Sequence, residues 1–185
     1  MKKMTVVQLA KNWKGKISLV VVDPESYREA CSSLLSGLLK ASRSANCIYI
    51  STTMPYAEAS RMLQKNGLDA KRLFFIDTMS KSASLGKERA ENVIFVEDPK
   101  NLTMVGVALS EALYKMEGKE RVLILDSISS LLMYNSPDIV LRFLHSVIGR
   151  MRAGEVSGIV FILVKDYGDI LTRLASFVDE VVELQ

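Results

Sequence analysis

The stretch from Arg121 to Ser127 holds the residue types in this chain that could do chemistry. Four apolar residues lead directly into Asp126 and Ser127, so a carboxylate and a hydroxyl would stand at the end of a buried strand. At the mouth of a parallel sheet, such an Asp can hold magnesium through water, beside phosphates cradled by a Gly-rich loop ending in Gly-Lys-Ser/Thr. No Gly-x-x-x-x-Gly-Lys-Ser/Thr stretch occurs in the sequence. The chain therefore carries one half of a phosphate site without the other.

Two interpretations of Asp126 stay open from the sequence. In the first, Asp126 and Ser127 are a residual metal or ligand contact. In the second, Asp126 caps the following turn by accepting hydrogen bonds from the Ser127 or Ser129 N–H groups.

The segment after the run Ile17–Val22 occupies the position of a phosphate loop. Aligned on that pattern, Asp23 falls on the first glycine, Arg28 on the second and Glu29 on the lysine. A phosphate loop needs glycines, so that backbone N–H groups can surround the oxygens, and a lysine for positive charge. Asp23, Glu25 and Glu29 would instead repel a phosphate, by about 1 kcal/mol per pair at ~4 Å even in water. We interpret residues 23–30 as a degenerate phosphate loop whose acids cap their own helix.

Other catalytic and metal-binding groups are also missing from the pattern. The run Cys47–Ile50 is followed by Ser51, Thr52 and Thr53, whose hydroxyls cannot deprotonate water as a carboxylate does. The chain has one histidine and two widely spaced cysteines, which gives no zinc spacing. We therefore predict no catalytic residue, no cofactor and no metal site.

Composition describes an ordinary globular protein. At 185 residues and 49% hydrophobic content, the chain suits one domain over residues 1–185. A net charge of +3 is too small to indicate nucleic acid or an anionic membrane. No apolar stretch approaches the ~20 residues of a membrane-spanning helix. With no signal peptide and with cysteines in apolar segments, we expect buried thiols in the reducing cytoplasm.

Short apolar runs alternate with helical patterns along the chain. The runs, rich in β-branched and aromatic residues, are Ile17–Val22, Cys47–Ile50, Arg72–Asp77, Val93–Val96, Val122–Leu125 and Gly158–Val164. Between them, apolar residues recur with the i, i+3, i+4, i+7 spacing of helices. The four prolines follow such runs and open helical patterns, at Pro24, Pro55, Pro99 and Pro137. This alternation predicts a parallel sheet with right-handed crossovers.

The same pattern places the remaining segments. The strands that begin at Ile17 and Val122 should lie inside the sheet, with Asp23 and Asp126 at the same edge. Residues 178–184 are more polar and suit an edge strand or a sheet end. Residues 1–16 are predicted to be an N-terminal helical extension, and residues 78–92 an exposed loop.

This order of elements resembles the core of RecA/KaiC-type ATPases. Residues Leu123–Leu131 match the Asp-Ser strand of that family, and residues 179–184 loosely match its last strand. The starts at Lys14–Val20 and Pro99–Thr103 are similar to archaeal KaiC-related families of unassigned function. The resemblance implies an α/β fold of three α/β/α layers with a mostly parallel sheet and a RecA-like core. The departures described above imply an inactive relative, a pseudo-ATPase.

Three classes of function remain, in decreasing order of support. The first is a non-catalytic module that associates with a protein partner or with itself, as RecA-like domains often do. The second is a sensor that binds a nucleotide or small ligand at the strand carboxyl ends without hydrolysis. The third, nucleic-acid binding, is disfavoured because no aromatic residues accompany the basic ones. The basic side chains that could form an interaction surface are Arg142, Arg150, Arg152, Lys81, Lys87 and Arg89.

Overall fold

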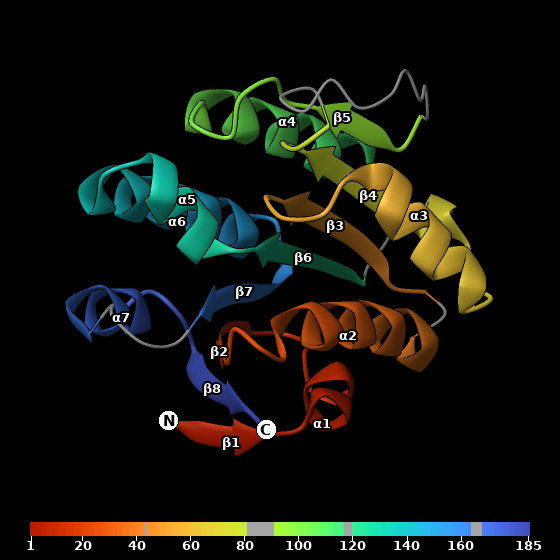
Figure 1. The fold of residues 1–185 in the computed structure, drawn as a ribbon, viewed down its shortest axis with the longest axis horizontal. Helices are drawn as coiled ribbons and strands as arrows, with labels where there is room; N and C mark the ends of the chain where they lie inside the picture. The colour runs from red at the N-terminus through yellow and green to blue at the C-terminus, as the bar shows by residue number, and fades with distance from the viewer. Residues whose placement is uncertain (43, 81–90, 117–119, 164–167) are drawn as a thin grey trace.

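The computed structural model describes residues 1–42, 44–80, 91–116, 120–163 and 168–185. Over these residues, eight strands form one parallel sheet in the order β1-β8-β2-β7-β6-β3-β4-β5 (Figure 1). The strands are β1 (Lys2–Met4), β2 (Ile17–Val22), β3 (Asn46–Ser51), β4 (Leu73–Asp77), β5 (Val93–Phe95), β6 (Arg121–Asp126), β7 (Ser157–Leu163) and β8 (Glu180–Leu184).

Helices cover both faces of the sheet. One face packs against α1 (Val6–Lys11), α2 (Tyr27–Ala41) and α3 (Tyr56–Lys65). The other packs against α4 (Leu102–Lys115), α5 (Ile128–Tyr134), α6 (Pro137–Ala153) and α7 (Gly168–Ala175). A short 3-10 turn, Ala70–Arg72, precedes β4. The predicted three-layer α/β/α fold is confirmed.

The central strands are continuous apolar runs because both of their faces are covered. All six residues of β2 are buried, as are the last five of β6. Both strands lie inside the sheet and run parallel, separated only by β7. Their carboxyl ends therefore meet at one edge, which places Asp23 and Asp126 there as predicted.

The sheet extends further at its N-terminal side than the sequence indicated. Strand β8 was predicted at an edge, but it pairs with β2 on one side and β1 on the other. Glu180 fits an interior position because it binds the Lys16 ammonium at 2.7 Å and the Ser18 hydroxyl at 2.8 Å. The expected helical extension contains helix α1, and the edge strand β1 precedes it. Three residues, two of them lysines, are too short and polar to give a strand signal.

Two other expectations need correction or restriction. Pro137 opens α6 as predicted, but it follows helix α5 rather than a strand. Of the loop predicted over residues 78–92, residues 81–90 lie outside the described chain. Its described beginning is not exposed, since Thr78 and Ser80 are buried.

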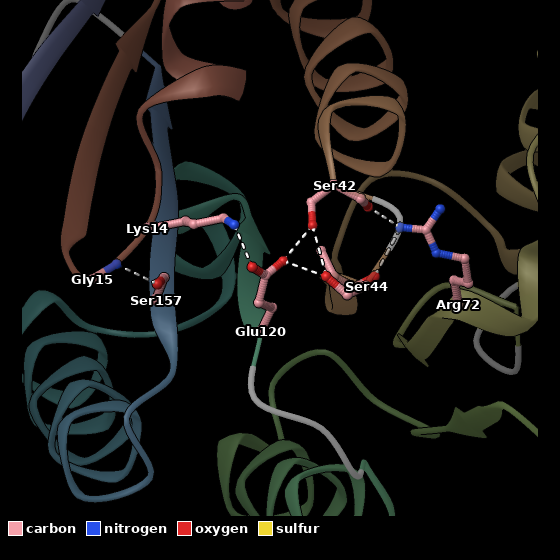
Figure 2. Close-up of polar contacts among 8 residues, drawn as sticks. Lys14, Gly15, Ser42, Ser44, Arg72, Glu120 and Ser157 are labelled. Carbon is pink, nitrogen blue, oxygen red and sulfur yellow. Dashed lines mark hydrogen bonds and ion pairs between the residues drawn. The ribbon is translucent and has the colours of Figure 1, made fainter.

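At the amino ends of the strands, a polar network ties the connections together (Figure 2). The Glu120 carboxylate accepts hydrogen bonds from the Lys14 ammonium and the Ser42 hydroxyl, and from Ser44 at 2.8 Å. The Arg72 guanidinium donates to the carbonyls of Leu39 at 2.8 Å and of Ser42, at the end of α2. These contacts fix the edge of the sheet opposite to Asp126.

Candidate functional site

The carboxylate of Asp126 lies at the last position of β6, fully buried. Its Oδ2 atom accepts hydrogen bonds from the Tyr49 hydroxyl and, at 2.9 Å, from the Thr53 hydroxyl. Its Oδ1 atom is buried and has no hydrogen-bond partner. A buried acceptor without a partner costs about 1–3 kcal/mol, so it is rare in a folded protein and marks a place where something else can bind.

Burial also changes the protonation of this side chain. It raises the pKa of Asp126 to about 7, because the charged form loses its hydration. Burial likewise raises the pKa of the neighbouring Tyr49 hydroxyl, which therefore stays protonated and serves as a donor. Near neutral pH, Asp126 can thus exist in either form, and a ligand that donates a hydrogen bond would favour the charged one.

The interpretation of Asp126 as a helix cap is wrong. Helix α5 is capped by the Ser127 hydroxyl, which accepts from the Ser130 N–H at 3.4 Å. The backbone around Asp126 is held by Thr52, whose N–H and hydroxyl both donate to the Asp126 carbonyl at 2.7 Å. The Asp126–Ser127 peptide bond is cis. The Asp126 side chain is left for other contacts.

A cavity of about 260 Å³ opens beside Asp126, between α2 and the ends of β3, β6 and β7. Its lining consists of Tyr27, Arg28, Cys31, Thr53, Met54, Asp126 and Leu163. The Tyr27 hydroxyl is buried and, like Asp126 Oδ1, has no hydrogen-bond partner. The Tyr27 ring is held edge-on against Phe161 of β7, with centroids 6.1 Å apart. Two of the four unpartnered buried polar atoms in the described residues thus belong to residues of this one cavity.

The segment predicted to be a degenerate phosphate loop forms a tight turn at the same edge. Asp23 Oδ1 accepts from the Glu25 N–H at 2.9 Å, and the Asp23 carbonyl accepts from the Ser26 N–H at 3.2 Å. Those two amides are thereby used within the turn. Arg28 pairs with Glu58 of α3 at 2.9 Å, and Glu29 is exposed in the first turn of α2. Four residues of this segment were singled out from the sequence, Asp23, Glu25, Arg28 and Glu29. Of these, Arg28 alone lines the cavity beside Asp126.

A second buried carboxylate, Asp77 at the end of β4, was not singled out from the sequence. Its Oδ2 accepts from the Tyr56 N–H at 2.7 Å and the Ser80 hydroxyl at 2.6 Å. Its Oδ1 accepts from the N–H groups of Met79 and Ser80, at 2.7 and 2.8 Å. The signal was available, since an apolar run ends in Asp77 as another ends in Asp126. With every acceptor used, Asp77 fastens the start of α3 and has no capacity left for a ligand.

The predicted basic surface is only partly free. Arg150 donates to the Gly106 carbonyl and, at 2.8 Å, to the Ser110 hydroxyl, joining α6 to α4. Arg152 pairs with Asp179 at 2.9 Å. Arg142 is exposed beside a groove between α4 and α6. The remaining predicted members, Lys81, Lys87 and Arg89, lie outside the described residues.

A cavity of about 650 Å³ lies between α1 and α2 near Leu184. No unpartnered buried polar atom of the described residues lines it, so it gives no chemical indication of a ligand. In the described parts of the chain, no group of three or more His, Cys, Asp or Glu side chains could hold a metal. Within the same residues, no helix combines the length and apolarity needed to cross a bilayer.

A known protein family matches most of this sequence. A model of a family of unknown function, DUF7504, matches residues 15–184. This chain belongs to the DUF7504 family. None of the curated proteins matches the sequence.

Several solved structures share the fold of this DUF7504 chain. An uncharacterized protein from Pyrococcus horikoshii, PH0321, solved with an unknown peptide, has a TM-score of 0.68 at 18% identity over 95% of this chain and 81% of that one. The KaiC-like protein PH0186 of the same species gives 0.62 at 13% identity, over 93% and 73% of the two chains. PH0250, also from that species, gives 0.57 at 15% identity, over 98% and 88%. The α/β fold of this chain is thus shared with a KaiC-like protein, as the sequence resemblance predicted.

Proposed function

We propose that this chain is a non-catalytic KaiC-like module that acts by protein association, and that its partner is a second copy of itself. The observation that carries the proposal is the distribution of exposed apolar side chains. Eight large apolar residues are exposed in the described chain, and all but Met1 and Val7 lie on the layer formed by α4, α5 and α6. They are Met104, Val107, Tyr114, Met133, Tyr134 and Ile139. Apolar side chains gathered on one face are typical of an association surface.

The shape and charge of this face suit self-association. A groove of about 420 Å³ runs between α4 and α6, with Val107 and Ile139 in its lining. Beside the apolar residues, α4 carries the pair Glu111–Lys115, at 2.6 Å. In a two-fold contact the same surface must complement itself, so adjacent charges of both signs can pair across the interface. The PH0321 structure, which contains a peptide, shows that a protein of this fold holds a polypeptide.

The proposal also includes the absence of ATP hydrolysis. The turn at Asp23 uses its own amides, and the hydroxyls of Ser51 and Thr52 hold the backbone at Met54 and Asp126. Neither segment offers the cradle or the general base that hydrolysis needs. We expect no ATP turnover above background, with or without magnesium.

Sedimentation velocity over a wide concentration range tests the association. We expect a reversible dimer whose interface exceeds ~1,000 Å² in total, as specific contacts generally do. The variant Val107→Glu should sediment as a monomer, because it puts a charge into the apolar face. The matched control is Val7→Glu, since Val7 is 62% exposed and Val107 54%, on opposite faces of the sheet.

Two results would overturn self-association through this face. One is a wild-type protein that stays strictly monomeric at the highest concentration. The other is a dimer that Val7→Glu weakens as much as Val107→Glu does, which would move the interface to the α1 side.

A further inference from the structure

We propose that the cavity beside Asp126 binds a free amino acid with an apolar side chain. In this arrangement the ligand's ammonium group contacts Asp126 and Tyr27, and its carboxylate contacts Arg28. The inference goes beyond the association proposed above, because the cavity lies on the α2 face of the sheet and the apolar face on the other.

Two residues of the cavity lining, Asp126 and Tyr27, each carry a buried polar atom that has no hydrogen-bond partner. Asp126 Oδ1 is an acceptor without a partner, and the Tyr27 hydroxyl can accept as well as donate. An ammonium group has three N–H donors, which is enough to serve both atoms. An ionised carboxylate has no donor, and a phosphate near pH 8 is a dianion, so the Asp126 charge would repel either. Among the described residues of the lining, a metal ion would find a single carboxylate.

The open side of the cavity offers the opposite charge. The Arg28 side chain is 76% exposed, so it stands at the mouth, whereas Asp126 is fully buried. One Arg28 nitrogen, Nη1, is used by Glu58 at 2.9 Å. A guanidinium has five N–H donors, so others can hold a carboxylate. A buried acceptor and an exposed cation along one small cavity match the two ends of a zwitterion.

The lining of the cavity favours a ligand with a small apolar side chain. Met54 and Leu163 line the cavity, and so does Cys31, whose thiol is kept protonated because burial raises its pKa. The volume of about 260 Å³ is below the ~300–1,000 Å³ typical of drug-sized ligands. An aliphatic side chain would displace water from these walls, which favours binding. A nucleotide would be too large and too strongly charged.

Isothermal titration calorimetry at pH 8 tests the class of ligand, because there both Asp126 and an α-ammonium are charged. The probes are L-leucine and 4-methylpentanoate, which is L-leucine without its amino group. We expect L-leucine to bind, and the acid to bind ~10- to 100-fold more weakly, the effect of one charge-assisted hydrogen bond. No measurable binding of L-leucine, or equal binding of both probes, would overturn the proposal.

Two variants test the site itself. Asp126→Asn should weaken L-leucine binding by ~10- to 100-fold, because the charge is lost while an oxygen remains for Tyr49 and Thr53. Tyr27→Phe removes only a hydroxyl that has no protein partner, so it should fold normally and weaken binding several-fold. The matched control is Tyr56→Phe, outside the cavity, which should leave the affinity unchanged. Affinity that survives Tyr27→Phe in full, or falls equally in the control, would contradict the proposed site.

Discussion

A carboxylate stands at each end of strand β6, and the two differ in exposure, in hydrogen-bond partners and in pKa. Glu120, directly before the strand, is partly exposed and accepts from Lys14, Ser42 and Ser44 (Figure 2). The hydrogen bond from Lys14, followed by those from the two serines, lowers the pKa of Glu120 to about 2. Asp126, at the other end, is fully buried with one oxygen unpartnered, and burial raises its pKa to about 7.

The difference separates a structural carboxylate from a candidate binding group. Glu120 has partners for both oxygens, so it joins the connections at the amino edge. Burial alone does not make a site, because Asp77 is as buried as Asp126 and yet accepts from the Tyr56, Met79 and Ser80 amides. The unused acceptor, together with a cavity beside it, is what distinguishes Asp126.

The largest effect that would sharpen this contrast is on the pH dependence of stability between pH 4 and pH 8. The folded-state pKa of Asp126 is raised from 3.8 to about 7, so the folded state binds its proton more tightly than the unfolded state. Stability from this group is therefore present below about pH 4 and is lost as pH rises towards about 7. Asp126→Asn cannot ionise and avoids this loss. Its stability relative to wild type should improve between pH 4 and pH 8 by up to about 4 kcal/mol.

Urea unfolding at both pH values measures that change. Tyr49 and Cys31, which lie near Asp126, stay protonated over this range because burial raises the pKa of each. A stability difference that is the same at pH 4 and pH 8, or that moves against the variant, would show that Asp126 ionises freely in the folded protein.

A pair of tyrosine variants gives a smaller effect. Tyr49→Phe should cost about 1–3 kcal/mol of unfolding free energy, because it removes a buried donor to Asp126. The ring stacked on Phe75 is kept, with centroids 5.2 Å apart. Tyr27→Phe serves as the matched control and should change stability little, since its hydroxyl has no partner. Equal losses in thermal or urea unfolding would mean that the Tyr27 hydroxyl is satisfied after all.

The smallest effect concerns the opposite end of the strand. Glu120→Gln should lower the melting temperature slightly at pH 7, because the ion pair with Lys14 is partly exposed. Since the pKa of Glu120 is lowered from 4.5 to about 2, its contribution is present above pH 4.5 and is lost as pH falls towards 2. The difference from wild type should therefore vanish in strong acid. Glu111→Gln, which removes the exposed pair with Lys115, is the control for the loss of an exposed ion pair elsewhere.

The sequence was informative where burial leaves a periodic trace. Runs such as Ile17–Val22 and Val122–Leu125 predicted interior parallel strands, because strands covered on both faces are made mostly of apolar residues. The sequence did not predict elements whose position depends on tertiary contacts rather than on local secondary-structure preference. Strand β1 has three residues, and β8 keeps Glu180 inside the sheet through Lys16 and Ser18. Helix α5, with seven residues, was too short to register as a separate element before Pro137.

For the candidate site, the sequence by itself determined that Asp126 ends an interior strand and that no Gly-x-x-x-x-Gly-Lys-Ser/Thr stretch accompanies it. It could not determine what surrounds that carboxylate. Tyr27, Tyr49 and Thr53 come from distant parts of the chain, and only the packing of α2 and β3 beside β6 brings them together. Whether a buried oxygen finds a donor depends on distances of a few ångströms between such segments, which residue types and spacing do not encode. The tertiary structure therefore decided that Asp126 is not a cap, and that one of its oxygens is left without a partner beside a cavity.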